Sequence, residues 1–165
     1  MCRNRQGTVP SPLLTVSWVP KTESWQNPLT GIITSSCGKR QNPILKREEF
    51  HDGLDIAAAE GTEVVAVKSG VVTAVRKSDT LGIVLEYETK DGFFIRYAHL
   101  EEILVEEGDE IRQGQVVAKV GTTGLSTGPH LHYTVKKDGM ILDPMPFVEL
   151  EHTKEVEAEY QERRA

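Results

Sequence analysis

Imidazole and carboxylate side chains recur at strand-like spacing in this chain of 165 residues. His130 and His132 stand two positions apart, after a turn rich in glycine and hydroxyl residues and before an apolar run. Side chains alternate between the two faces of a strand, so both imidazoles would project to one side while Leu131 faces the core. His51 and Asp55 are four positions apart, again an even number. Each pair could therefore present two metal-binding groups on one side of a sheet.

A further histidine, His99, closes an apolar run over residues 93–99, in which we expect Tyr97 to share its face. Two histidines and one carboxylate form a tetrahedral zinc site with one open position, the arrangement of a catalytic zinc. A structural zinc site would usually add thiolates, and neither cysteine belongs to these segments. The residues therefore predict a metal site. His152 lies in a charge-dense segment without such neighbours, and we expect it at the surface.

Glycine-led turns separate short β-branched runs from residue 31 to residue 148, which is the pattern of an antiparallel β domain. We expect strands at 31–35, 54–57, 64–67, 70–76, 83–88, 93–99, 116–120 and 130–136. The helical candidates are a turn near 100–104 and the segment 149–165, whose many charges favour a solvated or frayed helix. The predicted fold class is therefore mainly β.

Two segments of the chain echo each other. Residues 61–70 and 108–121 each begin with a glycine-led turn and continue through valine-rich strands to another glycine. Paired units of this kind occur in barrel-sandwich hybrids, the fold of biotinyl and lipoyl carriers. We expect an antiparallel β-sheet, barrel-sandwich hybrid-like domain over 29–148, a short N-terminal arm over 1–28 and a charged C-terminal tail over 149–165.

Composition excludes several classes of function. Lys and Arg number 19 against 25 Asp and Glu, and the net charge of −6 lacks the basic footprint of a nucleic-acid-binding protein. No apolar run approaches the ~18 residues of a membrane span, and two cysteines are too few for a disulfide scaffold. Residues 12–19 only loosely resemble a signal peptide because the run is short and lacks a small-residue cleavage site, so no export signal is readable.

Three motifs resemble, in the same order, those of the lysostaphin-like (LytM-type) zinc metallopeptidases. They are HDGLDIAA at 51–58, YAHL at 97–100 and GLSTGPHLH at 124–132. The resemblance spans about residues 29–148 and includes the segments 31–35 and 38–40 and the pair Asp143-Pro144. Members of this family cleave peptide bonds in peptidoglycan, in cross-bridges or in stem peptides.

The resemblance implies roles for five residues. His51, Asp55 and His132 would bind one zinc ion, which lowers the pKa of its bound water to ~7 and polarises a carbonyl group. His99 and His130 would flank that water, activate it and stabilise the charge that develops on the scissile carbonyl. The implied substrate is an extended, uncharged or weakly charged peptidoglycan peptide. The implied location is extracytoplasmic: the cell wall, the periplasm or an intermembrane space.

Three other functions compete with this interpretation. A biotinyl or lipoyl carrier needs a lysine at an exposed hairpin tip and has no use for the four histidines and the aspartate. A phosphocarrier of the sugar-permease type brings two histidines face to face but needs neither a carboxylate ligand nor a His-x-His pair. A non-hydrolytic module of the same fold, which binds a protein partner at the cell envelope or in a sporulation complex, would retain the resemblance without peptide cleavage.

Overall fold

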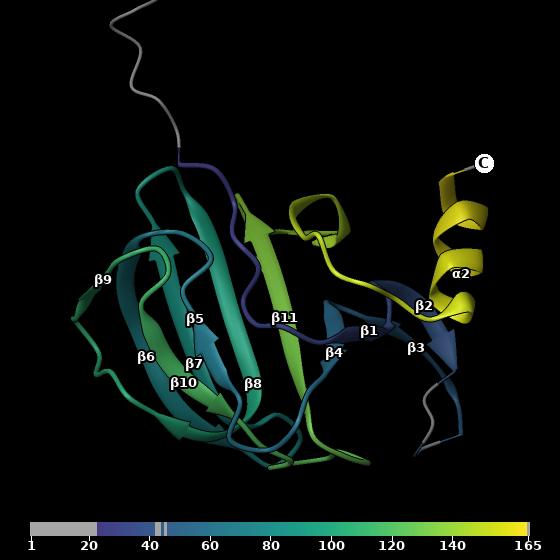
Figure 1. The fold of residues 1–165 in the computed structure, drawn as a ribbon, viewed down its shortest axis with the longest axis horizontal. Helices are drawn as coiled ribbons and strands as arrows, with labels where there is room; N and C mark the ends of the chain where they lie inside the picture. The colour runs from purple at the N-terminus through teal and green to yellow at the C-terminus, as the bar shows by residue number, and fades with distance from the viewer. Residues whose placement is uncertain (1–22, 42–43, 45, 165) are drawn as a thin grey trace, which may run out of the picture.

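Antiparallel strands form most of the structure, a computed structural model that describes residues 23–41, 44 and 46–164 (Figure 1). One sheet contains ten strands: β1 (Ile32–Ser35), β4 (Leu54–Ala57), β5 (Glu63–Val65), β6 (Gly70–Ser78), β7 (Gly82–Thr89), β8 (Phe93–Ile103), β9 (Glu110–Ile111), β10 (Val116–Val120), β11 (His130–Lys137) and β12 (Met140–Leu142). A second sheet pairs β2 (Gly38–Gln41) with β3 (Glu48–His51). The mainly β, antiparallel fold class is confirmed.

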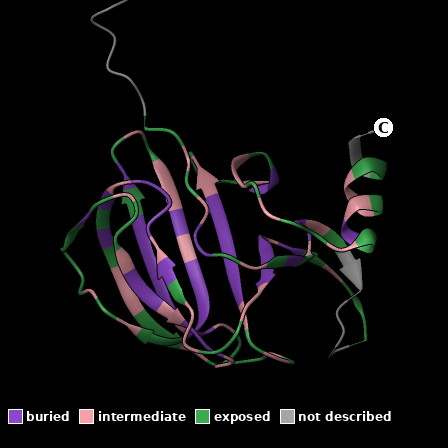
Figure 2. Cartoon of the chain, viewed as in Figure 1, coloured by how far each residue is buried: buried purple, intermediate pink, exposed green. Residues whose placement is uncertain are grey.

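The large sheet follows the order β1-β4-β11-β8-β7-β6-β9, with β12 beside β11 and β10 beside both β5 and β8. The two segments that echo each other in the sequence meet in the pair β5–β10, where Val64 lies opposite Ala118. Apolar side chains of both segments are buried there, among them Val64, Val117, Ala118 and Val120. Figure 2 shows the buried residues along the centre of the sheet, on β7, β8 and β11.

Several short elements were not predicted. Strands β2, β3, β9 and β12 are at most four residues long, and β2 and β3 are rich in charged and polar residues, so neither shows an apolar alternation. A 3-10 helix, η1 (Met145–Phe147), follows Pro144. The helical turn predicted near 100–104 is wrong for residues 100–103, because these residues continue β8 and pair with β10.

Strand β8 changes partner at His99. Residues 93–98 pair with β11, whereas residues 100–103 pair with β10. His99 sits between the two pairings with φ of 60°, a conformation that non-glycine residues seldom adopt. The resulting bulge reverses the alternation of side chains. Tyr97 therefore points into the core, and the expectation that it shares a face with His99 is wrong.

Both ends of the described chain pack against the sheet. Near the N-terminus, the amide of Gln26 donates to the carbonyl of Val67 (3.2 Å), and Trp25 stacks on Phe147 at a ring distance of 4.3 Å. Near the C-terminus, helix α2 (Lys154–Arg164) buries Val156 to 1% exposure. The expectation of a solvated or frayed helix is therefore wrong for the face of α2 that carries Val156. The similarity to a signal peptide at 12–19 lies outside the described residues.

None of the helices in residues 23–41, 44 and 46–164 combines the length and the apolar character that crossing a lipid bilayer requires.

Candidate metal centre

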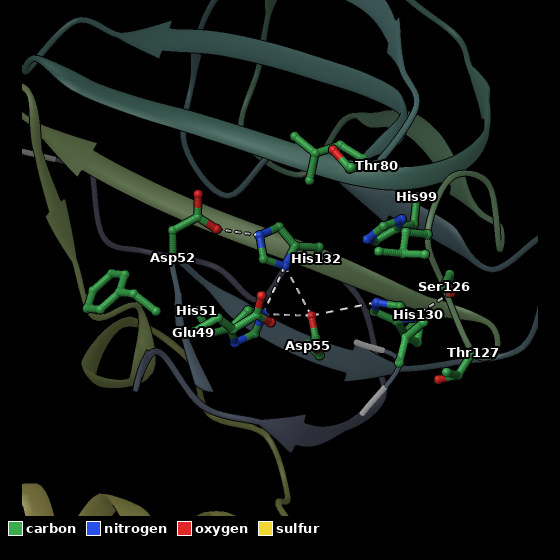
Figure 3. A pocket seen from close by; sticks show the side chains of 14 residues that line it. Glu49, His51, Asp52, Asp55, Thr80, His99, Ser126, Thr127, His130 and His132 are labelled. Carbon is green, nitrogen blue, oxygen red and sulfur yellow. Dashed lines mark hydrogen bonds and ion pairs between the residues drawn. The ribbon is translucent and has the colours of Figure 1, made fainter. Parts of the chain in front are cut away.

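Three neighbouring segments bring His51, Asp55 and His132 together (Figure 3). His51 ends β3, Asp55 is the second residue of β4, and His132 lies directly opposite Asp55 in the β4–β11 pair. Residues opposite each other in an antiparallel pair project to the same side of the sheet. All three side chains are buried, and their ligand atoms lie within 4.8 Å of one another.

The three candidate ligand atoms form a nearly equilateral triangle. Nε2 of His51 is 3.1 Å from Oδ1 of Asp55 and 3.1 Å from Nδ1 of His132, and Nδ1 of His132 is 3.1 Å from Oδ1 of Asp55. In a tetrahedral zinc site with bonds of ~2.0–2.1 Å, ligand atoms are roughly 3.3–3.4 Å apart. The donor set and its spacing therefore fit a small divalent metal ion.

Hydrogen bonds on the outer side of each ring orient both imidazoles. Nδ1 of His51 lies 2.9 Å from the carbonyl oxygen of Ser36. A carbonyl oxygen can only accept, so Nδ1 carries the proton and Nε2 presents a lone pair to the triangle. Nε2 of His132 lies 2.7 Å from Oδ1 of Asp52, so it donates to this carboxylate and leaves Nδ1 as the inward nitrogen.

Two carboxylates determine the charge of His132. Burial alone would lower the pKa of His132, but the hydrogen bonds to Asp52 and Asp55 outweigh it and raise the pKa to about 9. The hydrogen bond from His132 lowers the pKa of Asp52 to about 2, against the opposing effect of burial. Burial raises the pKa of Asp55, yet its close contacts with the His132 and His51 imidazoles hold it well below its usual range. The site therefore stabilises a positive charge, either a proton on Nδ1 of His132 or a metal ion in its place.

Asp52 is held in turn by a chain of ion pairs. Nη1 of Arg96 is 3.3 Å from its Oδ2, and Nε of Arg96 is 3.0 Å from Oε1 of Glu86. Arg76 approaches the same Glu86 oxygen at 3.0 Å. These contacts fix the carboxylate that orients His132.

His99 and His130 lie beside the triangle, with their rings 4.8 Å apart. Nδ1 of His99 donates to the carbonyl of Thr123 (2.7 Å), and Nδ1 of His130 donates to the carbonyl of Gly128 (2.9 Å). In the neutral form of each ring the lone pair is therefore on Nε2, and Nε2 of His130 lies 3.6 Å from Oδ1 of Asp55. Burial lowers the pKa of His99, which keeps this ring neutral at neutral pH.

A cavity of about 240 Å³ opens above these side chains. The four histidines of the motifs and Asp55 all line it (Figure 3). The half-exposed apolar side chains of Phe50 and Leu125 line it as well. Nearby, Gly53 serves the fold, because a Cβ there would lie 2.2 Å from the carbonyl oxygen of Tyr133. Gly128 faces open space, with no atom within 4 Å of such a Cβ.

All five residues singled out in the sequence therefore meet around one cavity, and His152 lies apart from it at the surface, paired with Glu157. Sequence reasoning missed Asp52 and Ser36, which bind the outer nitrogens of the two imidazoles. The signal for Asp52 was its place beside His51, since a metal-binding histidine needs an acceptor for its other N–H group.

Comparison with known proteins agrees with the sequence motifs. The model of peptidase family M23 matches residues 49–144, more than half of the chain. The chain therefore belongs to peptidase family M23. The resemblance to lysostaphin-like peptidases is confirmed by the catalytic domain of lysostaphin from Staphylococcus simulans, which is 31% identical with a TM-score of 0.63, over 68% of this chain and 88% of that one.

Other relatives differ in their named functions. Peptidoglycan DD-endopeptidase ShyB of Vibrio cholerae is 38% identical over 65% of this chain and 25% of its own length. A zinc-containing peptidase of Vibrio cholerae has a TM-score of 0.65 and 32% identity, over 78% of this chain and 41% of that one. Stage II sporulation protein Q of Bacillus subtilis is 38% identical over 59% of this chain and 36% of its own length. The chain thus spans well under half of these two curated relatives.

Proposed function

We propose that this chain is a zinc-dependent endopeptidase that hydrolyses peptide bonds in peptidoglycan. The observation that carries the proposal is the triangle of three ligand atoms at 3.1 Å with two further histidines at the same cavity. A purely structural metal site would not need the second pair of histidines. The names of the relatives, a peptidoglycan endopeptidase and a zinc-containing peptidase, support the same reaction and metal.

His51, Asp55 and His132 would hold the zinc ion, each through the inward atom described above. Bound zinc supplies Lewis acidity, which polarises a carbonyl oxygen and lets water act as a nucleophile near neutral pH. His99 and His130 would take the proton from the attacking water, stabilise charge on the carbonyl oxygen and return a proton to the leaving amine. Both can accept at Nε2 because their Nδ1–H groups are bound to backbone carbonyls.

The substrate in this proposal is an extended cross-bridge or stem peptide of peptidoglycan, which gives the protein an extracytoplasmic location. We assign catalysis to residues 29–148, with the N-terminal arm over 1–28 and the charged tail over 149–165 as extensions. The chain covers only a quarter of ShyB, so the substrate of the whole protein is part of what we propose.

A non-hydrolytic role is the second candidate, since a sporulation protein is as similar to this chain as the endopeptidase is. In that role the domain would bind a protein of the cell envelope and cleave nothing. Zinc content measured together with the loss of turbidity of purified cell walls separates the two candidates. The proposal predicts one zinc ion per chain and falling turbidity that stops in the His51→Ala variant. One zinc ion with constant turbidity would favour the binding role, and absence of zinc would contradict the metal centre.

A further inference from the structure

The segment 151–164 lies beyond the region that matches family M23 and docks on strand β1. The amide of Ile33 donates to the carbonyl of Glu151 (2.9 Å), and the amide of Thr153 donates to the carbonyl of Ile33 (3.2 Å). Helix α2 begins one residue later and buries Val156 against the core. Figure 1 shows α2 beside the edge where β1 and β2 lie. The C-terminal segment is therefore a packed part of the domain.

Ser36 connects this helix to the metal centre. Its hydroxyl donates to Oε1 of Glu159 on α2 (3.0 Å), and its carbonyl accepts the Nδ1–H of His51 (2.9 Å). Ser36 is itself buried, with 1% of its surface exposed. The residue that sets the orientation of a candidate metal ligand is thus held by the C-terminal helix.

Helix α2 also lies close to the candidate catalytic residues in space. Glu155 and Glu159 line a cavity of about 470 Å³ that Asp55 and His130 also line. The same Asp55 and His130 line the cavity above the metal centre. The helix therefore stands beside the centre, close enough for its docking to matter there.

We propose that α2 positions His51 for metal binding through a chain of contacts from Glu159 to Ser36 to His51. While α2 is docked, Glu159 fixes Ser36, and the Ser36 carbonyl keeps the proton of His51 on Nδ1. The lone pair of Nε2 then points into the triangle. Glu159 and Ser36 are positioning residues in this scheme, and the inference rests on the metal site of the proposed function.

Zinc affinity, measured by competition with a chelator of known affinity, tests the chain of contacts without any peptide hydrolysis. Loss of one neutral hydrogen bond corresponds to about a 2- to 10-fold change in an equilibrium constant, and loss of one to a charged group to about a 10- to 100-fold change. Because the Ser36–Glu159 contact acts on the metal only through His51, we expect a loss of about 2- to 10-fold in zinc affinity in both Ser36→Ala and Glu159→Ala. Glu162→Ala changes an exposed residue of the same helix and serves as the matched control, with unchanged affinity.

Two further variants distinguish positioning from general stability. Glu159→Gln keeps an oxygen that accepts from the Ser36 hydroxyl, so it should restore wild-type zinc affinity. The double variant with alanine at both positions should lose no more affinity than either single variant, because both remove the same contact. The Nδ1–H proton of His51, observed by NMR in the zinc-loaded protein, should exchange faster with solvent in Glu159→Ala than in the wild type.

Wild-type affinity in Ser36→Ala and Glu159→Ala would overturn the inference, and so would losses that add in the double variant. Reduced affinity in Glu159→Gln equal to that in Glu159→Ala would also contradict it. A wild-type protein that binds no zinc would contradict the proposed function itself. If the protein binds zinc but hydrolyses no peptide, zinc affinity still tests the contacts from Glu159 through Ser36 to His51.

Discussion

Replacing Gly53 with alanine should disturb both the fold and the metal centre. An added Cβ would lie 2.2 Å from the carbonyl oxygen and 2.8 Å from the carbonyl carbon of Tyr133, whereas ordinary contact begins at 3.4 Å. Both atoms belong to the backbone of β11, so no side-chain rotation relieves the overlap. The segment that carries Gly53, between β3 and β4, must therefore move away from β11 by about 1 Å. Tyr133 is adjacent to His132, so this movement displaces a candidate ligand.

Overpacking of a tight interior typically costs ~1–3 kcal/mol, and we expect the upper end, about 3 kcal/mol, because backbone atoms collide. Metal sites require ligand distances within about 0.2 Å of their preferred values, so a shift near 1 Å should lower zinc affinity at least about tenfold. Denaturant unfolding of the metal-free protein measures the first effect, and chelator competition measures the second.

Gly128→Ala is the matched control, at a glycine with open space around it. A Cβ there meets no atom within 4 Å, so we expect unchanged zinc affinity and a stability change of no more than about 1 kcal/mol, in the stabilising direction. Equal unfolding free energies and equal zinc affinities for Gly53→Ala and Gly128→Ala would refute the packing argument.

Three other predictions follow from the site. Asp52→Asn should weaken zinc binding about tenfold, the low end for such outer contacts because the amide oxygen still accepts from His132; chelator competition measures this. Alanine at His99 or at His130 should leave zinc bound and reduce peptide hydrolysis by ~10²–10⁴-fold. His152→Ala, which changes a histidine outside the site, serves as the control, and loss of zinc from either site variant would contradict the assignment of His99 and His130 as catalytic residues that do not bind the metal. Because the folded pKa of His132 is about 9 against an ordinary 6.5, the metal-free protein should be most stable below pH 6.5 and lose about 3 kcal/mol as the pH rises through 9; pH-dependent melting tests this, and an unchanged melting temperature would contradict it.

The sequence was sufficient to predict the strands that carry Asp55 and His132, because apolar runs and glycine turns reflect strong local preferences. It did not predict β3, the strand that ends at His51. Even spacing also predicted that His130 and His132 share a side, with Leu131 buried. It failed for His99, where β8 leaves β11 and joins β10. A change of partner strand depends on tertiary contacts, and nothing in the local residue pattern reports it.

The C-terminal helix shows a second limit of sequence reasoning. Its charges favoured a solvated helix, but docking depends on the side chains of Val156 and Tyr160, which pack against the core, and on backbone pairing with Ile33. The role of Ser36 could not be predicted either, because it binds His51 through its backbone carbonyl, which any residue type would supply. Contacts made by backbone atoms leave no signature in residue identity.

Fragment analysis of purified peptidoglycan after incubation with the zinc-loaded protein tests the central claim most directly. The account predicts peptides with new amino termini, formed by the wild-type chain and absent with His51→Ala. No new amino termini from a wild-type chain that holds one zinc ion would contradict the proposed hydrolysis and favour the non-hydrolytic binding role.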